Sequence, residues 1–237
     1  MRHRAGYGLF WIGLLPLLAA CASPPTPLPS AAQLLEQSAR AMQNLRSVHF
    51  TIERSGAPAY VDPGNTFIFR RATGEFVAPD AARAAVRVIG PALVAEVNVV
   101  SIGDQYWETN PLTGQWASYP GLGYNPASLF NAQTGLSALM RNDLTDAQLM
   151  GLEELEDLPG AKLFHLTATA PGAPLMAMTA DMIGRGRVTF DWWIEPDTYR
   201  VLRLRVVEPE TDSHDPTAWV IDFDQFDAGV SIEPPQR

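Results

Sequence analysis

The sequence is poor in cysteine and in positive charge. Cys21 is the only cysteine among 237 residues, which excludes an internal disulfide and a thiolate metal site. Stability must therefore come from a hydrophobic core, and the chain is long enough for one large domain. The 17 Lys and Arg residues are outnumbered by 26 Asp and Glu, giving a net charge of −9. Such an acidic chain is a poor partner for nucleic acid, and its overall charge disfavours electrostatic docking on anionic lipid.

Motifs of the common enzyme classes are also missing. The sequence has no Gly-x-Ser-x-Gly elbow, no phosphate-binding loop and no His-Glu-x-x-His helix. His49 and His165 fall on the polar phase of expected strands, which favours solvated histidines. His214 lies in an acidic loop without the spacing of a calcium site. We therefore expect no catalytic residue, no metal site and no cofactor, and the protein is not expected to be an enzyme.

The apolar run near the N-terminus covers only residues 9–18. A run of this length is too short to span ~30 Å of hydrocarbon as a helix. This run follows the basic residues Arg2 and Arg4 and precedes small residues, which predicts a signal peptide over residues 1–20. Leu18-Ala-Ala-Cys21 resembles the bacterial lipobox, so Cys21 is the expected lipid attachment site. The alternative is an ordinary signal peptide with a chance cysteine.

Residues 21–29 follow as the lipidated cysteine and a proline-rich tether, a semi-rigid spacer. Loss of residues 1–20 would remove two arginines and no acid, changing the net charge from −9 to −11. A diacylglyceryl group plus an amide-linked acyl chain would anchor the protein stably. We expect an exported protein at the outer face of the cell membrane or, in a host with two membranes, facing the periplasm.

Helical spacing of apolar residues is confined to three segments. Ser30 is placed to N-cap a helix over residues 30–45. The pattern over 126–158 is helical, and Thr145 with Gln148 predicts a capping box that starts a short helix through Leu152. Residues 174–183 predict a further helix.

Elsewhere the apolar period is two, which predicts strands. Leu202 and Leu204 are expected to point inward, with Arg203 and Arg205 outward. The expected strands cover residues 48–52, 65–71, 74–78, 83–89, 93–102, 105–109, 115–119, 162–170, 187–194, 202–206 and 219–223.

These elements predict an α+β fold, in which helices cover the concave face of a curved antiparallel sheet, a half-barrel, in a single domain over residues 30–237. The helices are few and short for so large a sheet, so a cavity between the two is expected. Adaptable methionines near the helices and many strand aromatics suit an apolar ligand, although simple core filling explains any one of them equally well.

The residues expected to line the cavity are apolar and lie on the inward phase of a strand or on the apolar face of a helix. They are Val48, Phe50, Ile52, Val86, Val88, Val97, Val99, Leu136, Leu139, Met140, Phe164, Leu166, Met178, Met182, Phe190, Trp192, Leu202, Leu204, Trp219 and Ile221.

Several short patterns follow one another along the chain. They are the lipobox, Ser47-Val-His-Phe-Thr-Ile, Ile102-Gly-Asp-Gln-Tyr-Trp before Gly114-Gln-Trp, Asn125-Pro-Ala-Ser-Leu-Phe, Gly135-Leu-Ser-Ala-Leu-Met, Phe190-Asp-Trp-Trp-Ile-Glu-Pro-Asp-Thr-Tyr-Arg and Ile221-Asp-Phe-Asp-Gln-Phe. Their order resembles that of the LppX/LprAFG lipoproteins, relatives of the LolA/LolB lipoprotein carriers. Glu195 stands where the family usually has Asp in a Trp-Ile-Asp-x-x-Thr turn.

This resemblance implies a LolA-like half-barrel whose apolar cavity holds the acyl chains of a lipid or glycolipid and carries it within the envelope. It implies no fixed set of functional residues, so the cavity positions above rest on strand and helix phase alone. A second hypothesis is an envelope sensor or assembly protein whose half-barrel binds a protein partner. The third, a hydrolase, lacks a nucleophile and a base.

Overall fold

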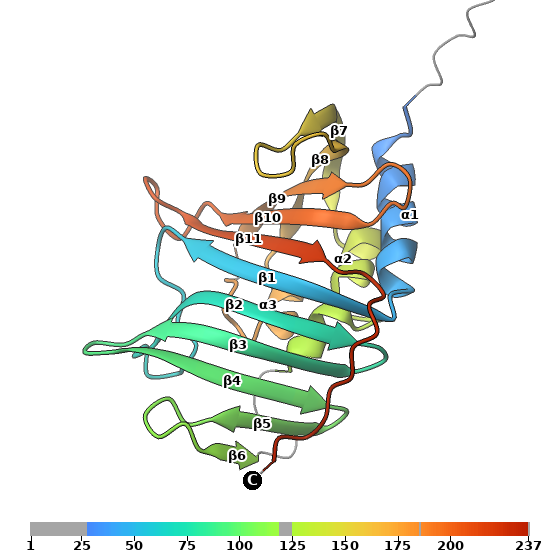
Figure 1. The fold of residues 1–237 in the computed structure, drawn as a ribbon. Coiled ribbons are helices and arrows are strands. Elements are labelled where there is room, and N and C mark those ends of the chain that lie inside the picture. Colours follow the sequence, from blue (N-terminus) through green and yellow to red (C-terminus); the bar gives the residue numbers. More distant parts are fainter. Residues whose placement is uncertain (1–27, 119–124, 185, 237) are drawn as a thin grey trace, which may run out of the picture.

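Eleven strands form one curved antiparallel sheet in the computed structural model, which describes residues 28–118, 125–184 and 186–236 (Figure 1). The strand order is β6-β5-β4-β3-β2-β1-β11-β10-β9-β8-β7. The strands are β1 (Ser47–Ser55), β2 (Ile68–Val77), β3 (Ala81–Ile89), β4 (Val94–Ile102), β5 (Gln105–Thr109), β6 (Trp116–Ser118), β7 (Thr145–Glu154), β8 (Lys162–Pro171), β9 (Arg187–Ile194), β10 (Val201–Glu208) and β11 (Thr217–Asp224).

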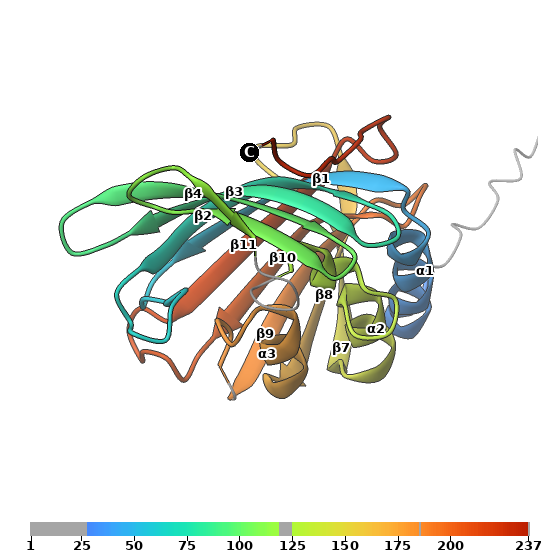
Figure 2. The same cartoon turned by 90° about the horizontal axis from the view of Figure 1, so that it is seen from below.

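The chain builds this sheet as two meanders that meet at its centre. β1 to β6 run outward to one edge, and β7 to β11 run from the opposite edge back to the middle. There the first and last strands pair, with Phe50 opposite Phe223 and Ile52 opposite Ile221. Figure 2 shows the resulting trough, with the helices inside its curve. The expected α+β fold, a curved antiparallel sheet with helices on its concave face, is confirmed.

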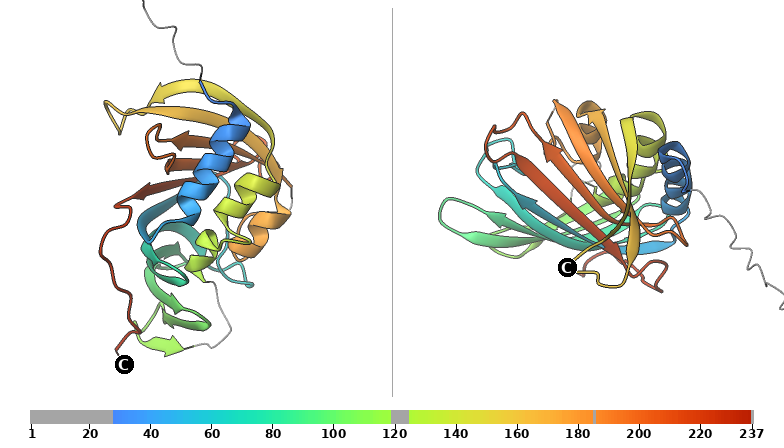
Figure 3. Two further views of the ribbon diagram at one scale, coloured as in Figure 1. Left: turned by 90° about the vertical axis from the view of Figure 1, so that its right-hand side faces the viewer. Right: turned by 90° about the horizontal axis from the view of Figure 1, so that it is seen from above.

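Four short helical elements lie on the concave side. They are α1 (Ala31–Gln43), the 3-10 helix η1 (Pro126–Phe130), α2 (Leu136–Asn142) and α3 (Ala173–Met178). Ser30 caps α1 as expected, because its hydroxyl accepts from the Gln33 backbone N–H while the Gln33 side chain accepts from the Ser30 N–H. The apolar face of α1 is buried, and α1 packs on α2 (Figure 3). No helix among the described residues is long and apolar enough to cross a membrane.

The predicted helix through Thr145, Gln148 and Leu152 is wrong, because this segment is the edge strand β7. It pairs with β8, placing Leu149 opposite Leu166. A local capping pattern is worth about 1 kcal/mol, less than the row of ladder hydrogen bonds that pairing with β8 supplies. The sheet therefore overrides the local signal. The predicted helix over residues 174–183 is also shortened, to α3.

The two strands expected over residues 65–71 and 74–78 form one strand, β2, and Gly74 lies in its interior. A Cβ there would lie 2.3 Å from the Arg83 carbonyl oxygen and 2.7 Å from the Phe50 ring. The glycine is therefore required by close packing of β3 and Phe50 against β2 rather than by a turn.

Leu202 points the other way from the prediction. The register of β10 against β9 shifts between Val201 and Arg203, so Leu202 is the extra residue of a bulge. It packs with Trp193 and Leu163 in a small apolar cluster outside the main core. Leu204, past the bulge, is buried in the main core.

The two strand histidines lie on the convex face but are not simply solvated. His165 stacks on Trp193 with ring centroids 4.9 Å apart, and its nitrogens lie 2.7 Å from Glu153 and 3.0 Å from Asp191. His49 contacts the Asp224 carboxylate at 2.5 Å. The convex face is therefore a network of cross-strand polar pairs, which explains why polar residues repeat there with period two.

The buried core extends from Leu34 to Phe223. A chain that begins at Ala22 therefore retains every strand and every core residue that the structure describes. Cys21 and most of the expected tether lie outside the described residues.

Candidate functional site

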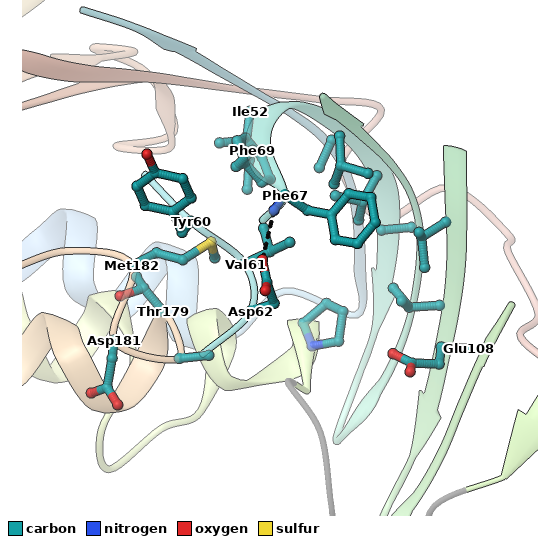
Figure 4. Close-up of a pocket in the computed structure, with 18 of the residues that line it drawn as sticks. Ile52, Tyr60, Val61, Asp62, Phe67, Phe69, Glu108, Thr179, Asp181 and Met182 are labelled. Carbon is teal, nitrogen blue, oxygen red and sulfur yellow. Dashed lines mark hydrogen bonds between the residues drawn. The ribbon is translucent and has the colours of Figure 1, made fainter. Parts of the chain in front are cut away.

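A cavity of about 730 Å³ lies on the concave side of the sheet, within the half formed by β1 to β5 and β11. This volume is in the range of small-molecule sites, which is ~300–1,000 Å³. Three segments cover the sheet here: the β1–β2 loop, η1 and the stretch after α3 (Figure 4). α1 packs on α2 and β7, and α2 contacts η1. Neither α1 nor α2 contributes a residue to the lining of this cavity.

The sheet wall of the cavity is apolar because alternate residues of each strand face inward. The register sets Val86 opposite Val97 and Ala84 opposite Val99, so their side chains adjoin on one face. The wall residues are Phe50, Ile52, Phe69, Ala72, Ala84, Val86, Val88, Val97, Val99, Tyr106, Trp219 and Ile221.

The β1–β2 loop closes one side through a turn built around Asp62. Its carboxylate accepts from the backbone N–H of Phe67 at 2.7 Å and of Thr66 at 3.0 Å. The Val61 N–H also donates to the Phe67 carbonyl at 2.9 Å. These bonds hold Tyr60, Val61 and Phe67 against the mouth (Figure 4). The Phe67 N–H, followed by the donors of Thr66, keeps the pKa of Asp62 below its usual value.

The stretch after α3 covers the other side. The Thr179 hydroxyl donates to the Leu175 carbonyl at 2.7 Å and accepts from the Ile183 N–H at 3.3 Å. Between them Ala180 and Asp181 adopt positive φ, +50° and +60°, which reverses the chain so that Met182 and Ile183 line the cavity.

Buried Glu208 ties this cover to the sheet wall. Its carboxylate accepts from the Gly184 backbone N–H and, at 3.1 Å, from the indole N–H of Trp219. Trp219 itself lines the cavity. The cover and the wall are thus held by one buried carboxylate whose two oxygens are both hydrogen-bonded.

Charge in the lining is of one sign. Asp62, Glu108 and Asp181 line the cavity, and none of the described lining residues is Lys, Arg or His. Glu108 accepts from the Tyr106 hydroxyl at 2.9 Å. A fixed anionic group would be repelled here, whereas hydroxyl or ammonium donors would find acceptors.

Nine of the positions expected from the sequence line this cavity. They are Phe50, Ile52, Val86, Val88, Val97, Val99, Met182, Trp219 and Ile221. Ten others do not line it and pack in the main core, namely Val48, Leu136, Leu139, Met140, Phe164, Leu166, Met178, Phe190, Trp192 and Leu204. Leu202 lies in the outer cluster described above.

These ten residues face the core as their strand or helix phase predicts. The position of the helices, however, decides whether a core-facing residue contacts the cavity. Strand phase identifies the concave face and gives no information on which half of it the helices cover. Tyr60, Val61 and Phe67 also line the cavity, although the sequence did not lead us to expect them there. The signal for them is a set of large apolar side chains within a loop rich in Pro and Gly, where polar residues are the norm.

The family assignment rests on most of the chain. The model of the LppX_LprAFG lipoprotein family matches residues 30–232. The chain belongs to this family. No curated protein sequence matches it.

Solved structures of the LppX_LprAFG type share the fold. LprF from Mycobacterium bovis is 17% identical with a TM-score of 0.65, covering 86% of this chain and 96% of LprF. The lipoprotein LppX of Mycobacterium tuberculosis is 16% identical with a TM-score of 0.59, covering 86% of this chain and 98% of LppX. The likeness therefore extends over nearly the whole length of both solved lipoproteins.

Proposed function

We propose that this LppX_LprAFG lipoprotein binds the acyl chains of a lipid or glycolipid in the cavity and carries that lipid within the cell envelope. Lipid on Cys21 would tether the protein to the outer face of the cell membrane or, in a host with two membranes, facing the periplasm. The observation that carries the proposal is the apolar cavity of about 730 Å³, whose lining reaches the surface at the exposed residues Tyr60 and Val61.

The energetics suit a carrier. Moving one methylene from water into an apolar cavity is favourable by ~0.8 kcal/mol. An acyl chain loses a similar amount on leaving a bilayer. Exchange between bilayer and cavity is therefore close to balanced, so loading and release are both accessible. The three lining carboxylates favour a head group that donates hydrogen bonds and carries no negative charge.

The test is lipid bound to the protein. The chain from Ala22 onward, which lacks Cys21, is purified, and lipid is sought by native mass spectrometry and by solvent extraction. We expect co-purified lipid, or uptake of a lipid supplied during incubation. A mass that stays that of the bare chain under both conditions would contradict the proposal.

Two adjacent residues of β3 give a matched pair of variants. Val86 lines the cavity, whereas Ala85 points to the convex face. Val86→Trp fills cavity space and should reduce lipid uptake by about tenfold or more, because each displaced methylene removes ~0.8 kcal/mol. Ala85→Trp adds the same group outside the cavity and should leave uptake unchanged. Circular dichroism checks that both variants are folded.

A further inference from the structure

Exposed apolar side chains gather at one end of the sheet, around the cavity mouth. Eight large hydrophobic residues of the described chain are exposed, and five of them lie on the β1–β2 loop, at the strand ends that flank the β3–β4 turn, or on the β5–β6 turn. These turns lie at the same end of the sheet, opposite α1 (Figure 1). We call these five residues the apolar rim: Tyr60, Val61, Ile89, Val94 and Leu112.

Part of the rim is one continuous row across the strands. Tyr60 is bridged to Ile68, Ile68 pairs with Ile89, and Ile89 pairs with Val94. Val94 is 56% exposed. Tyr60 and Val61 belong to the rim and to the cavity lining alike. The rim is therefore continuous with the site proposed to take up lipid.

Arginines stand directly behind the rim on the convex face. Arg70, Arg71 and Arg87 share a shallow groove with Ile89 and Val94, and Glu53 is the only acidic residue among its described lining. Glu53 pairs with Arg71 at 2.8 Å. In the described part of the chain Arg70 and Arg87 form no ion pair, although Glu96 lies opposite Arg87 in the strand register. This corner is locally basic in an acidic protein.

The spacing along the strand fits a membrane interface. Arg87 is two residues back from Ile89, about 7 Å at the rise of an extended strand. Interfacial apolar groups are buried ~5–10 Å into a bilayer. With Ile89 and Val94 inserted to this depth, Arg87 and Arg70 reach the level of the lipid phosphates, which bind arginine.

We infer that the apolar rim is a membrane-docking surface, with a phospholipid bilayer as its partner and Arg70 and Arg87 as its phosphate contacts. The inference deepens the proposed function, since docking would bring the cavity mouth to the bilayer that supplies the lipid. The acidic β10–β11 loop lies at the same end of the sheet, so contact is confined to the part of that end from the β1–β2 loop to the β5–β6 turn. The overall charge alone does not reveal this local reversal.

The test uses the chain from Ala22 onward, so that no anchor contributes, and flotation with vesicles of phosphatidylcholine with or without phosphatidylglycerol. Ile89→Ser/Val94→Ser should weaken vesicle binding by about tenfold or more, because two apolar contacts are removed. Met150→Ser/Leu152→Ser is the matched control, since both residues are exposed on β7 away from the rim, and it should bind as wild type. Arg70→Gln/Arg87→Gln should lower binding by about fivefold per arginine, mostly the part that depends on phosphatidylglycerol and is screened by salt.

The inference is overturned if the wild-type chain does not float with either vesicle, or if the rim variant and the β7 control lose binding equally. Uptake of a short-chain fluorescent lipid without net charge, supplied in solution, separates the docking result from the carrier proposal. A rim variant that takes up the probe normally but fails to float supports docking by the rim. If the wild-type chain floats with vesicles but takes up no probe, the result supports the docking surface and contradicts the carrier proposal. Unchanged melting temperatures establish that the exposed substitutions leave the fold intact.

Discussion

At the residue scale, Asp62 combines structure with electrostatics at the cavity mouth. Its carboxylate holds the turn through the N–H groups of Thr66 and Phe67, and the same group adds negative charge to the lining. Two substitutions separate these roles. Asp62→Ala removes both, whereas Asp62→Asn removes the charge and retains an oxygen that accepts hydrogen bonds.

We expect Asp62→Ala to loosen the β1–β2 loop and to speed release of a bound lipid probe several-fold. Hydrogen exchange at Thr66 and Phe67 measures the loop, and stopped-flow fluorescence measures release. Asp62→Asn should keep both amides protected and should improve uptake of an anionic probe relative to a neutral one. If the Ala and Asn variants release the probe at the same rate, the turn does not control the mouth.

The pH dependence of this turn follows from the direction of the pKa shift. Because the hydrogen bonds lower the pKa of Asp62, its contribution to stability is fully present above the unfolded pKa and is lost as pH falls through the folded pKa. The ordinary value is 3.8. The loop should therefore remain ordered at every pH above about 4 and open only in stronger acid, with exchange at Phe67 as the measurement.

At the scale of the element, Arg203 joins three parts of the convex face. From β10 it contacts Asp222 of β11 at 2.5 Å and Asp157 of the β7–β8 loop at 2.5 Å. These contacts raise the pKa of Arg203, chiefly through the hydrogen bond to Asp222, and lower that of Asp157. Only the arginine is well shielded from water, so the pairs stabilise the fold modestly.

Arg203→Leu should lower the free energy of unfolding at neutral pH by about 1 kcal/mol, since exposed Asp157 is screened by water. Arg205→Leu is the control, because Arg205 is more exposed and its single contact to Asp191 measures 3.3 Å; it should cost less than about 0.5 kcal/mol. The two free energies come from urea unfolding. Because the pKa of Asp157 is lowered, the stability that its contact with Arg203 contributes is present at neutral pH. It is lost only as pH falls through the pKa that Asp157 has in the folded protein. A cost for Arg205→Leu as large as that for Arg203→Leu would argue against this account.

Elements with a strong periodic signal were predictable, and elements that depend on pairing were not. The alternation of Val188, Phe190 and Trp192 identified β9, because one face of that strand is buried along its whole length. Thr145 and Gln148 predicted a helix because their spacing suits a helix N-terminus. The segment is a strand because it pairs with β8, and that pairing depends on residues distant in sequence. The inversion of Leu202 depends on a bulge, which leaves no trace in an apolar pattern.

At the scale of the molecule, the cavity exists because the two halves of the sheet are covered differently. The prediction of a sheet with too few helices to cover it followed from element counts alone. The location of the gap did not, because η1 and α2 belong to the connection from β6 to β7 and their placement depends on tertiary packing. Strand phase therefore predicts cavity positions for Val86 and Val97, which line the cavity, and equally for Trp192, which is fully buried in the core.

The halves nevertheless share one core, because β1 and β11 pair at the centre of the sheet and their side chains belong to the same apolar cluster as Trp192 and Leu166. We expect Trp192→Ala to lower the free energy of unfolding by about 3–5 kcal/mol, the usual cost of such a core truncation. Hydrogen exchange should show the loss equally in β8 and β9 and in the cavity strands β3 and β4, because strands of one cooperative unit unfold together.

Leu152→Ala on exposed β7 is the control and should leave exchange in both halves unchanged. Saturating lipid tests the same coupling from the cavity side. A ligand at about 100 times its Kd stabilises the folded state by ~2.7 kcal/mol, so it should offset much of the Trp192→Ala loss and restore protection in β8 and β9, which the cavity does not touch. Protection restored in β3 and β4 alone would mean that the halves unfold independently and that the central β1–β11 pair does not couple them.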